Sequence, residues 1–271
     1  MSVSADIRSD TPGEPGRRLA RPIVYPPAMT LWRALGSLGS RDDRVTELMD
    51  DSGADLATLE RTYEQFHLVN VFVSNQRTIY RRWIRPRLSA TQTRRVLDIG
   101  TGGADVPRAL LRWARADGLR LEVTAIDPDS RSLDWALRQP TEPGLVLRRV
   151  TSRDLADAGE RFEAVTSNHV LHHLNGREFG ALLADSEQLA AGGGIAVHAD
   201  IERTRLGYSG FWLGTLPFAR NLLAGSYIRA DGLTSIRRSH TAAELSRVLP
   251  AGWRVRRGFP SRLEVLWGAD A

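Results

Sequence analysis

The sequence predicts an α/β fold with a mostly parallel sheet of seven strands, an antiparallel C-terminal hairpin and a helical N-terminal cap. Short apolar runs alternate with helical stretches after Arg95, which is typical of parallel strands joined by crossover helices. Before Leu88 the apolar residues recur at helical spacing, and the last two apolar runs lie close enough to form a hairpin. The 271 residues suffice for one elaborated domain with a cap.

The N-terminal part divides into two segments. Residues 1–27 mix Ser, Asp, Arg, Gly and Pro without periodicity, so a mobile tail is expected there. In residues 28–90, Leu56, Leu59, Tyr63 and Phe66 recur at three- and four-residue steps, which predicts two or three cap helices.

Residues 91–271 are expected to form the main domain. Its parallel strands are predicted at 95–99, 121–126, 145–150, 164–167 and 194–198, with helices at 106–116, 132–138 and 178–191. Residues 200–236 look irregular and rich in aromatics, and are interpreted as an inserted lid over the substrate. Thr241 can cap a last helix, and the hairpin is predicted at 253–258 and 262–267.

The composition excludes several kinds of chemistry. All 37 basic residues are arginine, and without lysine a Schiff-base enzyme, a pyridoxal-phosphate enzyme and a phosphate-binding P-loop are impossible. The absence of cysteine excludes thiol nucleophiles, disulfides and cysteine-held metal centres, and no metal site is predicted.

The charge and hydropathy indicate the expected surroundings of the protein. A net charge of +5 is modest, and acidic residues are interleaved almost throughout, so no nucleic-acid partner is expected. No apolar run approaches the roughly 18 residues that span a bilayer, and the first twenty residues lack a hydrophobic signal segment. A cytoplasmic protein that can form a homodimer is expected.

The most informative stretch is VLDIGTGGAD at 96–105, where a buried strand runs into a glycine-rich turn and then a helix. Glycines let backbone approach a ligand closely, and the helix N-terminus offers unpaired N–H groups. A dinucleotide fingerprint would have its third glycine where Asp105 stands, and an aspartate would repel a pyrophosphate. Together with Asp98 at the strand end, the turn favours a ligand with a cationic, amino-acid-like end.

Polar residues also follow the next three strands. Asp127, in Ile126-Asp127-Pro128-Asp129, is placed to accept hydrogen bonds from two ribose hydroxyls. Asp154 after the third strand offers a carboxylate to an adenine amino group, and Asn168 follows the fourth.

These motifs resemble those of the class I, Rossmann-like S-adenosylmethionine-dependent methyltransferases over residues 94–200. The resemblance implies S-adenosyl-L-methionine as cofactor, with the methionine portion at Asp98, Gly100, Gly102 and Gly103. It assigns the ribose to Asp127, the adenine side to Pro128, Asp129, Asp154 and Leu155, and a further contact to Asn168. Ala104 departs from the pattern, because the motif often has a third glycine there.

The expected methyl acceptor is a small aromatic molecule. The loop Asn168-His169-Val170-Leu171 differs from the Asn/Asp-Pro-Pro-aromatic loop of enzymes that methylate amino groups, and the cytosine-C5 enzymes need a cysteine. The loop looks more like that of methyltransferases acting on quinone precursors and on phenolic or polyketide products of secondary metabolism. An aromatic lid is predicted from Tyr63, Phe66, Phe72, Tyr80, Trp83, Tyr208, Phe211, Trp212 and Phe218, and plain core packing is the alternative.

Candidate catalytic and substrate-binding residues follow from this acceptor class. Histidine is the side chain best suited to remove a hydroxyl proton near neutral pH. Of His169, His172, His173 and His240, we select His173 and His240 as candidate bases. Tyr208, Trp212, Arg229 and Arg237 are the candidate substrate-binding residues, although paired arginines are more often solvated charge.

The predicted function is methyl transfer to an oxygen of an aromatic or polyketide-type molecule. Three alternatives stay open: methylation of a ring carbon of a quinone, a non-catalytic cofactor-binding module, and an RNA methyltransferase.

Overall fold

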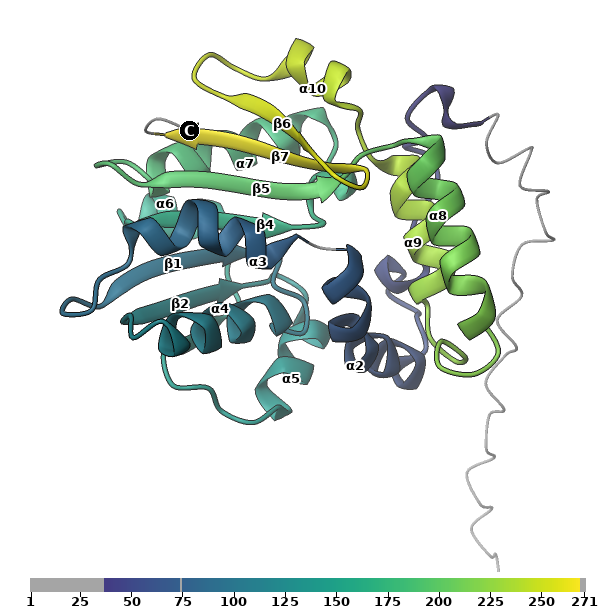
Figure 1. Ribbon diagram of the computed structural model, residues 1–271, viewed down its shortest axis with the longest axis horizontal. Helices are drawn as coiled ribbons and strands as arrows, with labels where there is room; N and C mark the ends of the chain where they lie inside the picture. The colour runs from purple at the N-terminus through teal and green to yellow at the C-terminus, as the bar shows by residue number, and fades with distance from the viewer. Residues whose placement is uncertain (1–36, 74, 269–271) are drawn as a thin grey trace, which may run out of the picture.

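The computed structural model describes residues 37–73 and 75–268 and contains one seven-stranded sheet (Figure 1). The strand order is β3-β2-β1-β4-β5-β7-β6; the first five strands in the chain pair in parallel, and β7 is antiparallel to both β5 and β6. This confirms the predicted fold class. The predicted tail at 1–27 lies outside the described residues.

The strands closely follow the predicted ranges. They are β1 (Arg94–Ile99), β2 (Leu121–Ile126), β3 (Leu145–Arg148), β4 (Ala164–Asn168), β5 (Ile195–Ile201), β6 (Arg254–Gly258) and β7 (Arg262–Gly268). Central strands are buried on both faces by the crossover helices, and their apolar runs made them recognisable.

The α-helices are α2 (Leu56–Val73), α3 (Gln76–Ile79), α4 (Asp105–Ala116), α5 (Ser130–Arg138), α6 (Ser152–Asp157), α7 (Gly176–Leu189), α8 (Arg205–Thr215), α9 (Ile228–Arg238) and α10 (Ala242–Val248). Short 3₁₀ turns include η2 (Leu48–Asp50) and η5 (Leu171–His173), and a π-helical turn over Tyr80–Ile84 continues α3. Capping boxes begin α6, α7 and α10; in α10, Thr241 accepts a hydrogen bond from Glu244 N, as the sequence predicts.

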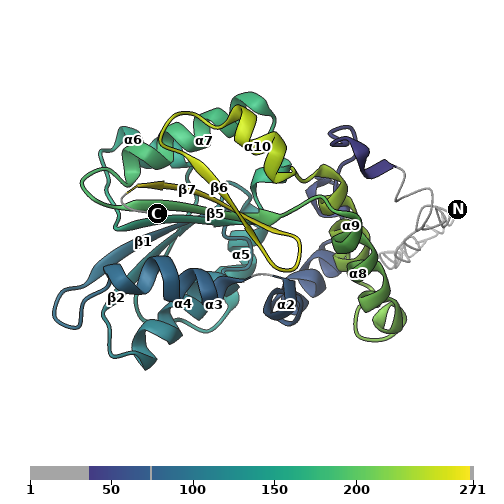
Figure 2. The ribbon, with the colours of Figure 1, turned by 45° about the horizontal axis from the view of Figure 1, so that its top comes forward.

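Helices cover both faces of the sheet (Figure 2). The helices α6, α7 and α10 pack on one face through a core that includes Leu155, Phe179 and Leu245. The other face carries α4 and the α3 turn, with Tyr80 and Trp83 in its core. Residues 76–87 therefore pack on the sheet, although the sequence pattern predicts them as part of the cap.

The cap is formed by α2, α8 and α9, which stand beyond the carboxyl ends of the parallel strands (Figure 1). Leu59, Tyr63 and Tyr227 form a small apolar core there, and Tyr227 N donates a hydrogen bond to Thr62 Oγ1 at 2.9 Å. The cap thus joins residues before β1 to residues between β5 and β6.

The prediction of an irregular segment over 200–236 is wrong, because α8 and most of α9 lie within it. Gly207, Gly210 and Gly214 weaken the helical pattern of α8, but Thr204 caps its first turn by accepting a hydrogen bond from Gly207 N. Packing against α9 then stabilises a helix that propensity alone would not predict. None of the helices within the described ranges is long and apolar enough to cross a bilayer.

Candidate active site

A cavity of about 480 Å³ lies where the carboxyl ends of β1, β2 and β4 meet the cap. The strand order reverses between β1 and β4, and such switch points are the usual ligand sites of open α/β sheets. Eight of the ten predicted cofactor-binding residues line it: Asp98, Gly100, Gly102, Gly103, Asp127, Pro128, Asp129 and Asn168. Residues from separate strand ends are therefore brought together, as the sequence predicts.

The glycine-rich turn needs the conformations that glycine permits. Gly100 and Gly102 have φ angles of 69° and 53°, and a Cβ on Gly100 would lie 2.6 Å from Val170 Cγ2. Ala104 also has a positive φ, of 60°, so it occupies the left-handed conformation that the missing third glycine would adopt more easily. A non-glycine residue there costs about 1 kcal/mol.

Asp98 lies in the buried part of β1, one residue before the end of the strand. Its side chain is buried, and the Thr166 hydroxyl lies 3.1 Å from its Oδ1. Burial raises the pKa of Asp98 to about 7, because removal from water disfavours the charged carboxylate. A cationic group in the cavity would stabilise the ionised form.

Asp127 shapes the turn while keeping capacity for a ligand. Its Oδ2 accepts a hydrogen bond from Gly102 N and its Oδ1 accepts one from Asp129 N, both at 2.9 Å. A carboxylate has about four lone-pair sites, so two remain for hydroxyl donors. Asp129 caps α5 and pairs with Arg131 at 2.8 Å.

The two predicted adenine contacts after β3 are not among the cavity-lining residues described. Asp154 is exposed, and its Oδ2 accepts hydrogen bonds from Thr151 N and Oγ1 in the capping box of α6. Leu155 is fully buried in the core of the sheet. Capping α6 uses the Asp154 carboxylate that the sequence analysis assigned to a ligand.

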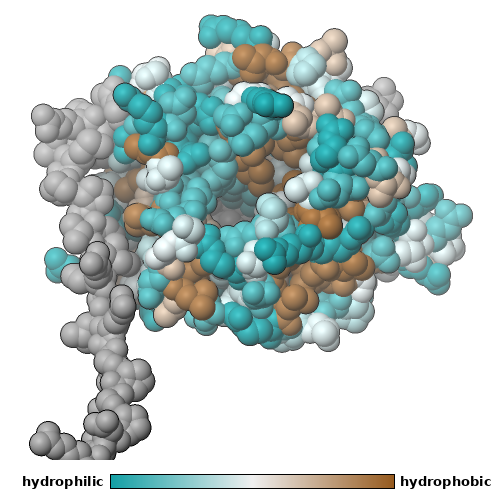
Figure 3. Space-filling model, turned by 180° about the vertical axis from the view of Figure 1, so that it is seen from behind, coloured by the Kyte–Doolittle hydropathy of each residue, from teal (hydrophilic) through white to brown (hydrophobic). Residues whose placement is uncertain are grey.

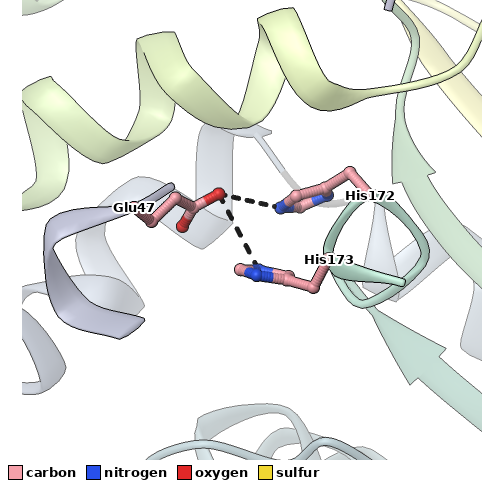
Figure 4. Close-up of side chains that lie close together, drawn as sticks. All are labelled: Glu47, His172 and His173. Carbon is pink, nitrogen blue, oxygen red and sulfur yellow. Dashed lines mark ion pairs between the residues drawn. The ribbon is translucent and has the colours of Figure 1, made fainter. Parts of the chain in front are cut away.

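Histidines after β4 and acidic residues of the cap also line the cavity, and three of these side chains lie close together (Figure 4). Nε2 of His172 lies 3.1 Å from Glu47 Oε1, and Nε2 of His173 lies 3.8 Å from the same oxygen. His172 is buried and His173 is partly exposed. Asp50 Oδ2 lies 3.0 Å from His173 Nδ1.

The other candidate base, His240, is not among the described residues that line this cavity. It precedes the cap of α10 and packs near the ring of Phe179, with 5.9 Å between ring centroids. Burial lowers the pKa of His240 to about 4. The structure thus separates the two candidate bases and places only His173 on the cavity.

None of the four predicted substrate-binding residues is among the described lining residues of the cavity. Tyr208 is buried in a cluster with Leu38 and Ile236, and Arg237 pairs with Asp42 at 2.5 Å. The Arg229 guanidinium lies 5.8 Å from the ring centroid of Trp212 on the neighbouring helix. These side chains make contacts within the cap. For the aromatics this is the core packing that the sequence left open, whereas the arginines make specific contacts instead of the solvated charge that was their alternative.

The comparison with protein families decides which family this fold and site belong to. A family model described as a methyltransferase domain matches residues 72–249, about two thirds of the chain. The chain belongs to this methyltransferase family. The resemblance to class I S-adenosylmethionine-dependent methyltransferases is thereby confirmed.

Among curated proteins, the methyltransferase is similar to enzymes named ubiquinone biosynthesis O-methyltransferase. It is 32% identical to that of Rhizobium leguminosarum bv. trifolii (strain WSM2304) over 112 residues, which are 41% of each protein. It is 31% identical to that of Mesorhizobium japonicum (strain LMG 29417 / CECT 9101 / MAFF 303099) over 112 residues, 41% of this chain and 42% of the relative. The similarity thus spans about two fifths of these relatives.

Solved structures share the fold at low sequence identity. An O-methyltransferase family protein from Burkholderia thailandensis has a TM-score of 0.54 and 15% identity, covering 89% of this chain and 69% of that protein. The plantazolicin methyltransferase BpumL, in complex with a triazolic desmethylPZN analog and SAH, has a TM-score of 0.51 and 9% identity, covering 87% and 95%.

Several residues that line the cavity of the methyltransferase were not predicted from the sequence. Glu47, Asp50 and Asp231 bring carboxylates from the cap, and Asp231 is buried and accepts hydrogen bonds from Leu48 N and Met49 N. These three acids lie in segments without a recognisable motif, so no sequence pattern indicated them. Of the predicted lid aromatics, Tyr63, Phe66 and Phe211 do line the cavity.

A second cavity of about 600 Å³ adjoins the first, and Ile201 and Phe211 line both. Its walls are mainly apolar and come from α8, the segment after it, and the turn between β6 and β7. The face seen in Figure 3 is also hollowed near its middle, with hydrophobic residues gathered beside the hollow.

Proposed function

We propose that the protein transfers the methyl group of S-adenosylmethionine to an oxygen of a small apolar molecule of aromatic or polyketide type. One observation carries this proposal: the acids and glycines typical of the cofactor site line the same cavity as the Glu47 and His173 side chains. Cofactor and acceptor can therefore meet in one cavity. The names of the O-methyltransferase relatives support oxygen as the methylated atom.

The cofactor would lie along the ends of β1 and β2. Asp98 and the Gly100–Gly103 turn would hold the methionine portion, and the two free acceptor sites of Asp127 would take the ribose hydroxyls. Pro128 and Asp129 would face the adenine side, and Asn168, whose Oδ1 accepts a hydrogen bond from Gln76 Nε2 at 2.7 Å, would border the reacting end.

The pKa of Asp98 makes cofactor affinity depend on pH. A cationic cofactor needs the carboxylate, so below pH 7 we expect the affinity to fall about tenfold per pH unit, and above it to level off. In the free protein, folding stability depends on pH in the opposite direction. The stability gained from protonated Asp98 is present below the ordinary pKa of 3.8 and is lost as pH rises through 7. Calorimetric titrations between pH 5.5 and 8.5 measure the affinity.

Asp98→Asn provides the matched comparison for this pH series. The asparagine side chain cannot titrate. The affinity of this variant for the cofactor should therefore be weaker but vary little over the same pH range. Equal pH slopes in the two proteins would contradict the assignment of Asp98 to the cationic end of the cofactor.

The protein contributes to the reaction mainly by positioning. An oxygen lone pair of the acceptor forms the new C–O bond while the C–S bond breaks, its electron pair stays on sulfur, and the hydroxyl proton leaves to solvent. Holding the two reactants aligned and dry can supply about 7 to 11 kcal/mol of the barrier. His173 lies where it can act on that hydroxyl, and the acids Glu47, Asp50 and Asp231 disfavour a phosphate-bearing acceptor such as RNA.

The second cavity supports an acceptor with an extended apolar part. Phe211 and Ile201 are shared by both cavities, so a ring in the first could continue as an apolar chain into the second. A homodimer and a cytoplasmic location stay predictions from the sequence.

Gly214→Leu tests this acceptor class. A Cβ at Gly214 would meet no described atom within 4 Å, and the residue lines the second cavity, so leucine should fill space without disturbing the fold. With phenolic acceptors of increasing alkyl length, we expect kcat/KM to drop about tenfold for long chains, given about 0.8 kcal/mol per buried CH₂, and to stay unchanged for short ones. Equal effects on both would contradict the use of the second cavity.

A further inference from the structure

Glu47, His172 and His173 converge on one point at the edge of the cavity, although Glu47 is distant in the sequence (Figure 4). The two histidines belong to η5, directly after β4, and Glu47 immediately precedes η2. One ligand-type atom from each residue lies within 4.8 Å of the other two. We call these three residues the His–His–Glu cluster.

Each histidine of the cluster is oriented by a further carboxylate. Nδ1 of His172 lies 2.7 Å from Asp200 Oδ1, and Nδ1 of His173 lies 3.0 Å from Asp50 Oδ2. A carboxylate at Nδ1 selects the tautomer with its proton on Nδ1 and leaves the lone pair on Nε2. This arrangement is the usual support of histidines that bind metal ions.

The separations within the cluster fit a shared ion. With metal–ligand bonds of 2.0 to 2.1 Å, neighbouring ligand atoms of a tetrahedral site lie about 3.3 Å apart. The two Nε2 atoms lie 3.1 and 3.8 Å from Glu47 Oε1, on either side of this value. Nε2 of His172 is moreover buried, and the partner it faces among the described residues is Glu47 Oε1, so this nitrogen points into the cluster.

The turn that carries the histidines is held in place from behind. Arg238 donates hydrogen bonds to the carbonyl oxygens of His172 and His173, and Arg41 donates to those of His172 and Leu174. His172 N also donates to Asp200 Oδ2 at 2.9 Å. The ligand side chains are thus mounted on a rigid turn, as a metal site requires.

We propose that the His–His–Glu cluster binds a divalent transition-metal ion such as Zn²⁺, with an open coordination position toward the cavity. Two imidazoles and one carboxylate suit such an ion, whereas Mg²⁺ prefers oxygen ligands. The role of the ion rests on the proposed function: His173, as a ligand, would act on the acceptor hydroxyl through the bound ion. The ion would bind that hydroxyl and favour loss of its proton to solvent. The oxygen lone pair would then attack the methyl carbon as described above, without any change in metal oxidation state.

Metal binding can be measured without knowing the acceptor. The full-length protein, stripped with a chelator, would be titrated with Zn²⁺ and, separately, Mn²⁺ by calorimetry, with elemental analysis after gel filtration. We expect one equivalent of Zn²⁺ to bind, and His173→Asn to weaken it at least about 100-fold. His173 is partly exposed, so this variant should fold.

Two further variants separate metal binding from general damage to the fold. Asp50→Asn, which removes only the supporting carboxylate, should weaken Zn²⁺ binding about 10- to 100-fold. His240→Asn removes a histidine outside the cluster and should leave it unchanged. Binding that is absent, or equal in the wild type and the His173 variant, would overturn the proposal.

The same stripped protein distinguishes the two proposals. Titration with S-adenosylhomocysteine reports on the cofactor site, whose residues are separate from the cluster. Cofactor binding without Zn²⁺ binding would overturn the metal site alone, and Zn²⁺ binding without cofactor binding would overturn the proposed function alone.

Discussion

Replacing Asp127 with alanine is expected to weaken S-adenosylmethionine binding at least about 100-fold. Two charge-assisted hydrogen bonds to the ribose would be lost, each contributing about 1.5 to 3 kcal/mol. The carboxylate also accepts hydrogen bonds from Gly102 N and Asp129 N, so the glycine-rich turn would lose support as well. Equilibrium dialysis with labelled cofactor measures the change, and Asp98→Ala should behave similarly.

Asp154→Ala is the matched control, because Asp154 also follows a strand but is exposed and caps α6. It should leave cofactor affinity unchanged while lowering the free energy of unfolding by about 1 kcal/mol. Undiminished cofactor affinity in the Asp127 variant, or a large loss of cofactor affinity in the Asp154 variant, would contradict the assignment of the ribose to Asp127.

The second large effect concerns His173, for which asparagine should lower kcat about 10²- to 10⁴-fold while leaving cofactor affinity unchanged. The imidazole lines the same cavity as the predicted cofactor residues without being one of them, so chemistry and cofactor binding should separate. Single-turnover methyl transfer measures the rate, and the calorimetry described above measures the affinity.

His240→Asn distinguishes between the two histidines selected from the sequence. Its ring packs near Phe179, away from the described lining of the cavity, so this variant should keep its activity. A loss of activity in the His240 variant, with His173→Asn active, would contradict the assignment of His173.

The cofactor side of the site is predictable from the sequence because topology does most of the positioning. In a parallel sheet the carboxyl ends of the strands meet at one edge. Asp98 and Asp127 therefore come together for any conformation of the connecting loops. Asp154 is the exception, because its carboxylate accepts a hydrogen bond from Thr151 N in the cap of α6. The position of Asp154 after a strand does not reveal this interaction.

The acceptor side depends on tertiary packing instead. Glu47 reaches His172 only because α9 and the segment before α2 pack together, where Ser235 donates a hydrogen bond to Glu47 Oε1 at 2.7 Å. No local pattern marks such a contact. The aromatic content of 200–236 did suggest a lid over the substrate, but which of its side chains line the cavity follows from helix packing. That packing places Phe211, rather than Tyr208 or Trp212, on the cavity.

A crystal structure with S-adenosylhomocysteine tests the central claim most directly, because it shows which residues hold the cofactor. We predict the ribose hydroxyls within hydrogen-bond distance of the Asp127 carboxylate, and the homocysteine portion along Gly100–Gly103 with its sulfur facing His173. A ligand bound elsewhere, for instance in the second cavity alone, would contradict the account.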